Sequence, residues 1–377
     1  MFDSGYMWLL IGPLVLPVPA PLPVVEALDK VDVDVSRDRS GFQLAFTIGK
    51  TSPLQLALLP LGFFEPMVTR VVILVVIKGL PHVIMDGVVT RQELQPGNAP
   101  GESKLTITGE DLSVLMDVVE VRLPFLGMPD AARINLILAK YLAFGIVPVV
   151  VPPPVLNADS PTSRFDTQMA TDRAYVREVA AQSGYVFYIE PGPLPGQSIA
   201  YFGPDIRPPP IPQRALSVNL DAETNVERIS FAFDGLAKKT TLMFLLDPVT
   251  HKVALPPVPI PGINPLRPPL GIRPAVPARI SFAADMARLS PTEAAKRALG
   301  IANQSVAPIK VTGALDVAAY GAPLKARGLV GLRGAGFSYD GLYYVDSVTH
   351  SIKRGEYKQN FELSRDGLGA LAPVVVP

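Results

Sequence analysis

The sequence contains no cysteine, which excludes disulfide bonds and thiolate metal ligands. It has only three histidines, His82, His251 and His350, which lie far apart in the chain with no HExxH motif. A histidine zinc site would need all three to come together, so no metal and no cofactor is predicted. His350 follows a predicted strand beside a turn, and its ordinary interpretation is an exposed polar residue.

An excess of charge of one sign is also lacking. Lys and Arg together number 34, as do Asp and Glu, so the net charge is about zero. Proteins that bind phosphates usually have a basic excess. Lys238 and Lys239, with Arg228 and Lys252, are too sparse for a nucleic-acid patch. We therefore predict no nucleic-acid recognition.

Common enzyme signatures are missing as well. The chain has no GxSxG nucleophile elbow. Gly331, Gly334 and Gly336 do not have the dinucleotide-binding spacing, and no phosphate-binding lysine-serine pair follows them. Glycines at a β-bulge or a tight packing contact explain this run better. The sequence predicts a non-enzymatic protein, with a β-rich hydrolase as an alternative that no motif supports.

Two aspartates need a separate interpretation. Asp32 and Asp34 share one face of a predicted strand, as the carboxylates of a glycosidase would. Asp29 and Asp38 lie close by in the sequence, which favours a solvated hairpin edge. Charges of this kind discourage unwanted edge-to-edge pairing of strands, so no catalytic residue is assigned.

Apolar residues and proline are abundant. The chain is 48% hydrophobic and only 18% charged, so we expect apolar surface to be buried against partner subunits. Proline is excluded from helix interiors and central strands, so the 41 prolines and 30 glycines mark many loops and rigid connectors.

The N-terminal residues 1–24 form a distinct apolar segment. Residues 4–25 carry no charge, which resembles a signal peptide or a membrane span. No Lys or Arg precedes this stretch, and its many prolines would break a spanning helix, so no stable membrane insertion is predicted. We expect an extended arm that docks on another subunit. Its predicted interface residues are Trp8, Leu9, Leu10, Ile11, Leu14 and Leu16.

Residues 25–120 read as a first β domain. Alternating apolar residues over 31–35 and 42–48 flank a polar turn and predict an antiparallel hairpin. A short helix is expected after Ser52, and the continuous apolar run 71–77 predicts a strand that is buried on both faces. Strands over 83–94 and 104–108 complete a small sheet or barrel, and a helix is expected after Asp111.

An α+β block follows at residues 121–213, and strands return at 214–369. In the middle block we predict a helix from Asp130 to about Gly145, a second helix over 171–183, and a hairpin. The last block carries a proline-rich insertion at 251–277 and a capping box at 290–293. A short tail, 370–377, ends the chain. The fold class is therefore mainly β with α+β inserts.

The two β blocks echo each other. Asp86-Gly87 and the strand that follows Gly101-Glu102 have counterparts in Asp340-Gly341 and the strand after Gly355-Glu356. Turn residues and strands in one order indicate an internal duplication of a barrel module. Two unrelated antiparallel sheets remain the alternative, since short turn motifs also match by chance.

Five runs of the sequence, taken in order, resemble a known family. They are Leu105–Ser113, Thr171–Pro204, Gly328–Leu332, Asp340–His350 and Gly355–Arg365. They resemble the baseplate hub family of contractile tails, which includes late-control D tail proteins of temperate phages and the hub part of type VI secretion spike proteins. The resemblance extends from about residue 24 to residue 369.

The resemblance implies a fold and a role. Members carry two tail-tube-like β-barrels with smaller α/β domains between them, so three subunits present six barrels. Such a ring matches a sixfold tail tube on one face and a threefold spike on the other. The implied partners are two further copies in a homotrimer, the tail tube protein, the trimeric spike protein and other baseplate proteins. The implied location is the baseplate of a virion or injection particle, assembled in the bacterial cytoplasm.

The sequence also departs from the family pattern. No oligosaccharide-binding-type barrel, β-helix or lysozyme block follows residue 369, so the spike and any cell-wall hydrolase are expected on separate chains. A carbohydrate-binding tail adhesin is the alternative function. It would need exposed aromatic grooves, and Trp8 is the sole tryptophan.

Overall fold

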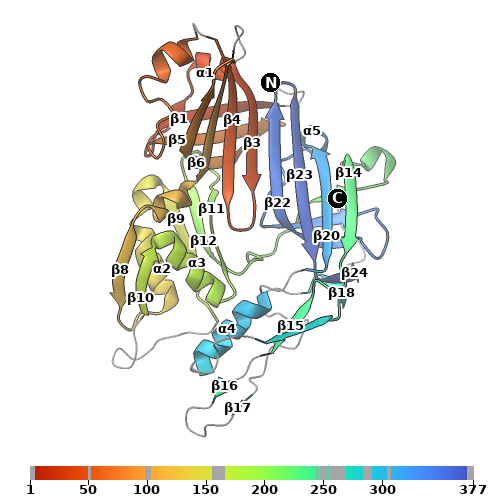
Figure 1. Ribbon diagram of the computed structural model, residues 1–377. Helices are drawn as coiled ribbons and strands as arrows, with labels where there is room; N and C mark the ends of the chain where they lie inside the picture. The colour runs from red at the N-terminus through yellow and green to blue at the C-terminus, as the bar shows by residue number, and fades with distance from the viewer. Residues whose placement is uncertain are drawn as a thin grey trace.

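A computed structural model describes residues 5–49, 52–97, 103–154, 166–242, 245–246, 253–254, 269–282, 291–303 and 307–371. Its main feature is one large, mostly antiparallel sheet that runs through both predicted β blocks. A smaller α/β block lies beside the first half of this sheet, and helix α4 lies below (Figure 1). The mainly β fold class is confirmed.

The first β block begins with the predicted hairpin. Inward apolar side chains of β3 and β4 alternate with outward polar ones, and the register pairs Val33 with Phe42. β5 is buried along nearly its whole length, as its unbroken apolar sequence predicts. The elements of this block are β3 (Leu28–Val35), β4 (Ser40–Ile48), η1 (Leu54–Leu58), β5 (Thr69–Ile77), β6 (Leu80–Gln95) and β7 (Ser103–Asp111).

The second β block contains five strands with the same pairings. In the first block β3 pairs with β4, β4 with β7, β7 with β6, and β6 with β5. In the second block β14 pairs with β20, β20 with β23, β23 with β22, and β22 with β21. These strands are β14 (Arg228–Phe233), β20 (Ile309–Asp316), β21 (Leu329–Arg333), β22 (Gly341–Lys353) and β23 (Glu356–Arg365).

The two blocks therefore repeat one strand topology, as the sequence echo predicts, but the sequence alignment needs a correction. A β-bulge at Thr90 interrupts the β6–β7 register, and one at Asp346 interrupts the β22–β23 register. When the two repeats are aligned by their bulges, Asp86 of the first repeat is equivalent to Leu342 of the second. The turn motifs would instead make Asp86 equivalent to Asp340, two residues earlier. Turn residues recur for local reasons, whereas a bulge fixes register across a strand pair.

The N-terminal segment is part of this chain's own sheet. β1 (Gly5–Pro13) pairs antiparallel with β5 from Gly5 opposite Ile77 to Pro13 opposite Thr69. The expectation of a free arm is thus corrected for residues 5–13, because the backbone groups of the exposed β5 edge find their partners within the chain. β2 (Val18–Pro19) and α1 (Leu22–Ala27) return the chain to β3.

The middle block packs around a separate apolar core. Helices α2 and α3 bury Ile134, Ile137, Val176 and Val179 against the small sheets beside them. The helix predicted over 171–183 is present as α3, and Thr171 caps it through its hydroxyl. The elements are β8 (Glu120–Phe125), α2 (Asp130–Ala139), η3 (Leu142–Phe144), β9 (Ile146–Val150), β10 (Asp166–Thr171), α3 (Asp172–Gln182), β11 (Val186–Pro191) and β12 (Ser198–Gly203).

Two predicted helices are shorter than expected. The helix after Asp111 is a single 3-10 segment, η2 (Leu112–Asp117), and Val119 lies exposed beyond it. α2 ends at Ala139, and the left-handed Gly145 follows η3 instead. A strand follows each shortened helix within a few residues, β8 after η2 and, beyond η3 and Gly145, β9 after α2, so tertiary pairing overrides the local helical pattern.

The remaining described elements lie between residues 213 and 370, outside the five paired strands of the second block. Residues 253–254 and 269–277 are the described part of the predicted proline-rich insertion, and residues 372–377 lie outside the described residues. These elements are β13 (Gln213–Ser217), η4 (Asp221–Glu223), β15 (Lys239–Leu242), β16 (Leu245–Leu246), β17 (Val253–Ala254), β18 (Gly271–Pro274), β19 (Arg279–Phe282), α4 (Pro291–Asn303), α5 (Val317–Tyr320) and β24 (Gly367–Ala370).

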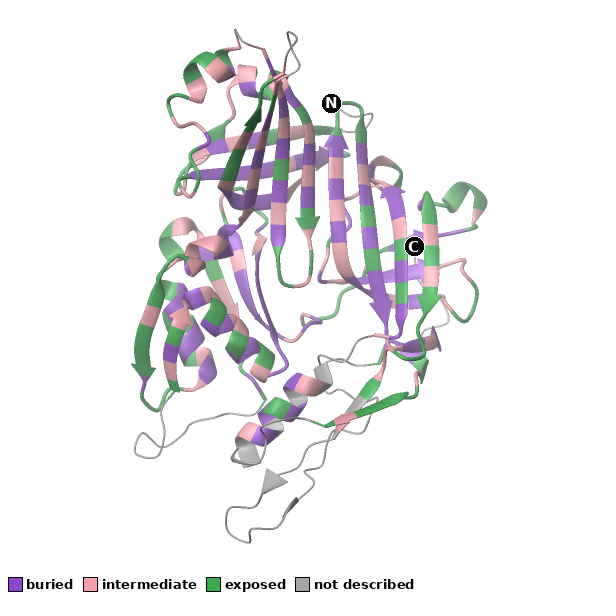
Figure 2. Ribbon diagram, in the orientation of Figure 1, coloured by how far each residue is buried: buried purple, intermediate pink, exposed green. Residues whose placement is uncertain are grey.

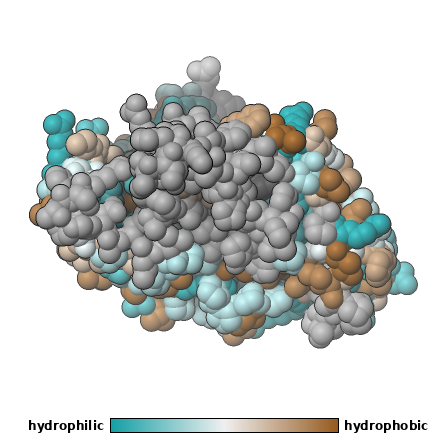
Figure 3. Space-filling model, turned by 90° about the horizontal axis from the view of Figure 1, so that it is seen from below, coloured by the Kyte–Doolittle hydropathy of each residue, from teal (hydrophilic) through white to brown (hydrophobic). Residues whose placement is uncertain are grey.

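Burial follows the alternation of the strands. Buried residues (purple) alternate with intermediate (pink) or exposed (green) ones along β3, β4, β22 and β23, which marks one face as core and the other as more exposed (Figure 2). At the lower end of the molecule, Ile280 and Phe282 of β19 are among the exposed apolar residues. Seen from that end, hydrophobic and hydrophilic residues are mixed around the described rim (Figure 3).

Candidate functional site at the junction of the two strand blocks

The two blocks are joined edge to edge by strands β22 and β3. These strands pair antiparallel, from Val348 opposite Val35 to Lys353 opposite Lys30. On the outward face, the Thr349 hydroxyl donates a hydrogen bond of 2.6 Å to Asp34. This strand pair, which we call the internal joint, makes one continuous sheet from two repeats of the same topology.

The inward face of the internal joint is fully packed. Val31, Val33, Val348 and Ile352 are each at most 3% exposed, and they belong to one apolar cluster that extends through both blocks. Burying a valine or isoleucine side chain is worth about 1.5–3 kcal/mol. The joint is therefore held by side-chain packing as well as by its hydrogen-bond ladder.

A buried arginine ties three parts of the chain together beside the joint. Arg327, which precedes β21, donates from Nε to the Ser36 carbonyl at 2.8 Å and from Nη2 to the Ser40 hydroxyl at 3.0 Å. Its guanidinium lies 4.2 Å from the ring centre of Tyr188 in the middle block. One side chain thus links the second block, the first hairpin and β11.

Arg37 makes a second link between the first hairpin and the middle block. Its guanidinium binds the buried Asp205 in a bidentate pair, with Nε to Oδ1 at 3.0 Å and Nη2 to Oδ2 at 2.6 Å. Burial opposes the charged form of Arg37, but Asp205 and neighbouring groups outweigh it, and the pKa of Arg37 is raised. The hairpin tip is consequently held on both sides.

A third link fixes the first block to the middle block. Arg70 and Asp86 form a buried bidentate pair, with both N–O distances at 2.7 Å. Arg70 also donates to the carbonyls of Leu14, Phe144 and Gly196. Five charge-assisted hydrogen bonds satisfy this guanidinium, so the pair acts as a cross-brace between segments that are far apart in sequence.

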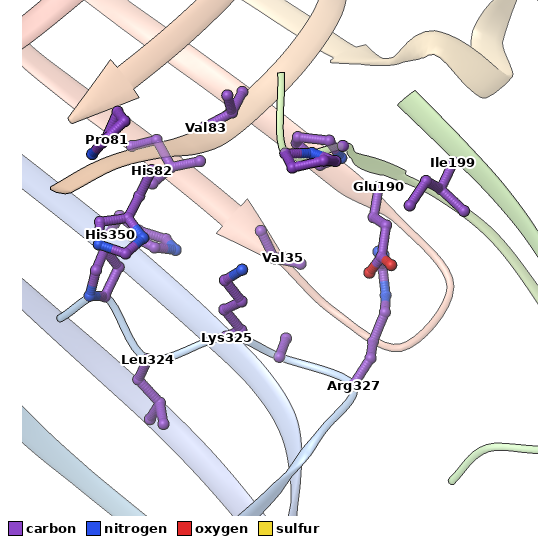
Figure 4. Close-up of a pocket in the computed structure, with 16 residues that line it drawn as sticks. Val35, Pro81, His82, Val83, Glu190, Ile199, Leu324, Lys325, Arg327 and His350 are labelled. Atoms are coloured by element: carbon purple, nitrogen blue, oxygen red, sulfur yellow. The ribbon is translucent and has the colours of Figure 1, made fainter. Parts of the chain in front are cut away.

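A cavity of about 340 Å³ opens where the three parts meet. Figure 4 shows His82, Lys325 and His350 on one side of it and Glu190 and Arg327 on the other. Much of the remaining wall is apolar or proline. Glu190 is bound to Arg207 by a 2.8 Å salt bridge, which leaves it paired.

The two histidines in the cavity wall both have a lowered pKa. His350 is 4% exposed, and burial lowers its pKa to about 4. The predicted exposed residue is therefore buried, because it lies on the inward face of the joint, opposite Val33. Its Nδ1 lies 2.7 Å from the Tyr357 hydroxyl. Burial, and then the charge of Lys325, lower the pKa of His82.

The aspartates considered for catalysis have structural partners. Asp32 forms a salt bridge with Lys30 at 2.7 Å, and Asp34 accepts from Thr349. Within the described ranges, no group of three or more His, Asp or Glu residues could hold a metal ion. His251 lies outside those ranges. The arrangement at the junction can position strands and bury charges, and we assign it no reaction.

The six predicted interface residues divide into two sets. Leu9 and Ile11 point into this chain's core, with exposures of 5% and 0%, and Leu14 packs against the middle block. Trp8 and Leu16 are 53% and 69% exposed, and Leu10 is intermediate. Only the exposed set can contact another molecule, and that contact remains a prediction.

The sequence reasoning missed the three arginine links. Arg70, Arg327 and Arg37 each bind groups more than 15 residues away, and no local pattern signals such pairs. A single cue exists for Arg70, since a charged residue that begins an apolar strand predicts a buried partner. Among the residues that the structure describes, no helix is long and apolar enough to cross a membrane.

Comparison by sequence finds no matching family model and no matching curated protein. Comparison of the fold finds several solved structures. A 43 kDa tail protein from prophage MuSo2 of Shewanella oneidensis has a TM-score of 0.62 at 14% identity, covering 97% of this chain and 100% of that chain. A tail protein from Neisseria meningitidis MC58 has a TM-score of 0.59 at 15% identity, covering 97% and 98%. The fold is that of a phage tail protein.

A third neighbour extends the tail-protein fold to secretion machines. An E. coli component of the type VI secretion system, itself similar to T4 bacteriophage tail proteins, has a TM-score of 0.53 at 11% identity. It covers 93% of this chain and 77% of that chain. The predicted baseplate hub fold is confirmed by these neighbours. Within it, the internal joint is where the two repeats meet.

Proposed function

We propose that this chain is a structural, non-catalytic subunit of a baseplate hub, in which three copies form a ring that adapts a sixfold tail tube to a threefold spike. The observation that carries the proposal is the repeat. Two strand blocks of one topology are joined edge to edge within a single chain. Three such chains present six similar units, which is what a threefold-to-sixfold adaptor requires.

The tail-protein fold supports the rest of the proposal. Its neighbours include phage tail proteins and a type VI secretion component. We infer that the partners are the tail tube protein, the trimeric spike protein and other baseplate proteins, in a virion or injection particle assembled in the bacterial cytoplasm. The domain division at residues 25–120, 121–213 and 214–369 belongs to the same proposal.

The exposed apolar residues near the N-terminus are proposed as a contact surface for one of these partners. Tyr6 and Trp8 project from the outward face of β1, with ring centres 6.4 Å apart. Because Trp8 is the sole tryptophan, its fluorescence reports on this surface alone. Emission should shift to shorter wavelength in the assembled particle relative to the isolated chain. An unchanged spectrum would remove this surface from the proposal.

Reconstitution with the cognate tail tube protein tests the adaptor role. Analytical ultracentrifugation of the mixture should show a complex with three copies of this chain for six of the tube protein. The matched control is a tube protein from an unrelated tail, which should sediment separately. A one-to-one complex, or no complex with the cognate tube, would contradict the adaptor role.

A further inference from the structure

The sheet ends in two open edges, one in each repeat. β14 pairs with β20 on one side, and the described chain places no strand on its other side. β6 pairs with β5 only as far as Val88. Beyond that point β7 covers one edge, and residues 92–95 have no described strand on the other. β14 lies at the outer border of the sheet (Figure 1).

These open edges correspond to the two strands of the internal joint. Aligned by its bulge, β6 corresponds to β22, and Glu93 takes the place of Thr349. The strands β6, β7, β4 and β3 of the first block pair in the same order as β22, β23, β20 and β14 of the second. In this alignment β14 corresponds to β3, and Ala232 takes the place of Asp34. β6 and β14 are therefore the counterparts, at the free ends, of the strands that already pair at the centre.

The inward side chains of β14 resemble those that β3 buries in the internal joint, whereas β6 has Gln92 where β22 has Val348. β14 presents Ile229 and Phe231 toward the core where β3 has Val31 and Val33. The valines are buried, whereas Ile229 and Phe231 are only partly so. Near the end of β6, Leu94 is 42% exposed, and Phe233, the last residue of β14, is 48% exposed. An apolar edge strand of this kind is a template for pairing with another chain.

We propose that β6 of one copy pairs antiparallel with β14 of the next copy, in the register of the internal joint, so that Glu93 lies opposite Ala232 and Leu94 opposite Phe231. The occupant is a second copy because each chain carries both halves of this contact and already forms the equivalent contact within itself. The contact is heterologous, so it repeats around a closed ring. This inference rests on the proposed ring and specifies its seam.

A cysteine pair tests the register in a chain that has no cysteine of its own. Directly opposed Cβ atoms lie about 4.5–5.5 Å apart, which is close to the spacing of a disulfide. In the double variant Glu93→Cys with Ala232→Cys, mild oxidation should produce covalent dimers and trimers on non-reducing gels. The positive control is Asp34→Cys with Thr349→Cys, the equivalent pair of the internal joint, which should close within one chain.

The off-register control is Glu93→Cys with Arg228→Cys. Arg228 shares the outward face of β14 with Ala232 but lies four residues away, about 14 Å along the strand. This pair should give no covalent trimer. If it cross-links as well as the on-register pair, or if the internal-joint pair closes while the on-register pair stays monomeric, the register is wrong.

A charge at the edge provides a second, independent measurement. Phe233→Lys should raise the concentration at which half of the trimer dissociates by at least about tenfold, because it places an unpaired charge in the seam. Phe337→Lys is the matched control, since Phe337 is a 75% exposed phenylalanine outside both edges. Equal dissociation of the two variants would overturn the seam.

Light scattering distinguishes failure of the β6–β14 seam from failure of the proposed ring. A trimer that resists the edge charge and forms no on-register disulfide overturns the β6–β14 seam and leaves the ring in place. A chain that is monomeric at all accessible concentrations overturns the ring itself, and the seam with it.

Discussion

Three arginines, of which Arg70 and Arg327 are buried and Arg37 is partly buried, hold the parts of this molecule together. Arg70, Arg327 and Arg37 each lie at a boundary between blocks and are held by several acceptors. A buried charge is tolerated only when it is paired and hydrogen-bonded, so removing one partner leaves the other uncompensated. We therefore expect these positions to be far more sensitive than surface pairs.

Replacement of Arg70 by Met should lower the free energy of unfolding by about 3–5 kcal/mol, because Asp86 is left buried without its partner. Arg91→Met is the matched control, since Arg91 forms an exposed salt bridge with Glu93 and such pairs contribute about 0–1 kcal/mol. Urea unfolding followed by circular dichroism measures both. Equal effects of the two substitutions would contradict the role of Arg70 as a cross-brace.

His350 predicts a pH dependence of stability. Its pKa is about 4 in the folded chain and about 6.5 when unfolded, so between these values only the unfolded chain binds the proton. Stability should therefore fall as the pH drops below 6.5, and this contribution should level off near pH 4. Its size is on the order of 3 kcal/mol.

The variant His350→Gln isolates this effect. Glutamine keeps a polar group beside Tyr357 but cannot be protonated. Unfolding free energies measured from pH 7 to pH 4 should decline less steeply in the variant than in the natural chain. Parallel curves would show that His350 is not held neutral at the internal joint.

At the scale of strands and helices, the pattern of the sequence predicts what is local. The hairpin β3–β4 and helix α3 follow from alternation and from the Thr171 cap. The long-range features do not follow. β1 reads as an unpaired arm because nothing local shows that it covers β5, and the pairing of β22 with β3 joins residues more than 300 positions apart.

The sequence likewise predicts some features of the candidate site and not others. The repeat was visible in sequence because turns and strands recur in one order, but its alignment was two residues off until the bulges fixed it. Of the six predicted interface residues, Trp8 and Leu16 keep exposed side chains, and alternation along β1 turns Leu9 and Ile11 inward. The direction of β1 could not be known without its partner strand.

Close packing between strands gives a prediction at this scale. Gly109 of β7 lies opposite Phe42, and a Cβ at that position would be 2.2 Å from the Phe42 Cζ atom and 2.4 Å from the Val88 carbonyl oxygen. Gly109→Ala should therefore destabilise the first block by about 1–3 kcal/mol, measured by urea unfolding. Gly49→Ala is the control, since nothing lies within 4 Å of its Cβ position. A neutral Gly109→Ala would show that the β4–β7 contact is looser than described.

At the scale of the whole molecule, a shared apolar core joins the two repeats, and the arginine links attach the middle block, which has its own core. In the proposed ring, a chain held together in this way would offer at its open edges the strand pairing that it already makes at its internal joint. Ring formation would repeat it at three seams between chains, and would remove the open edges that a single chain leaves.

The oligomeric mass of the purified chain tests the central claim most directly. Light scattering coupled to size-exclusion chromatography, at micromolar concentration and neutral pH, should give three times the 40.4 kDa mass of the chain. Three chains would provide six strand repeats in one ring. A species of 40.4 kDa that persists at every concentration would contradict the ring and the adaptor role built on it.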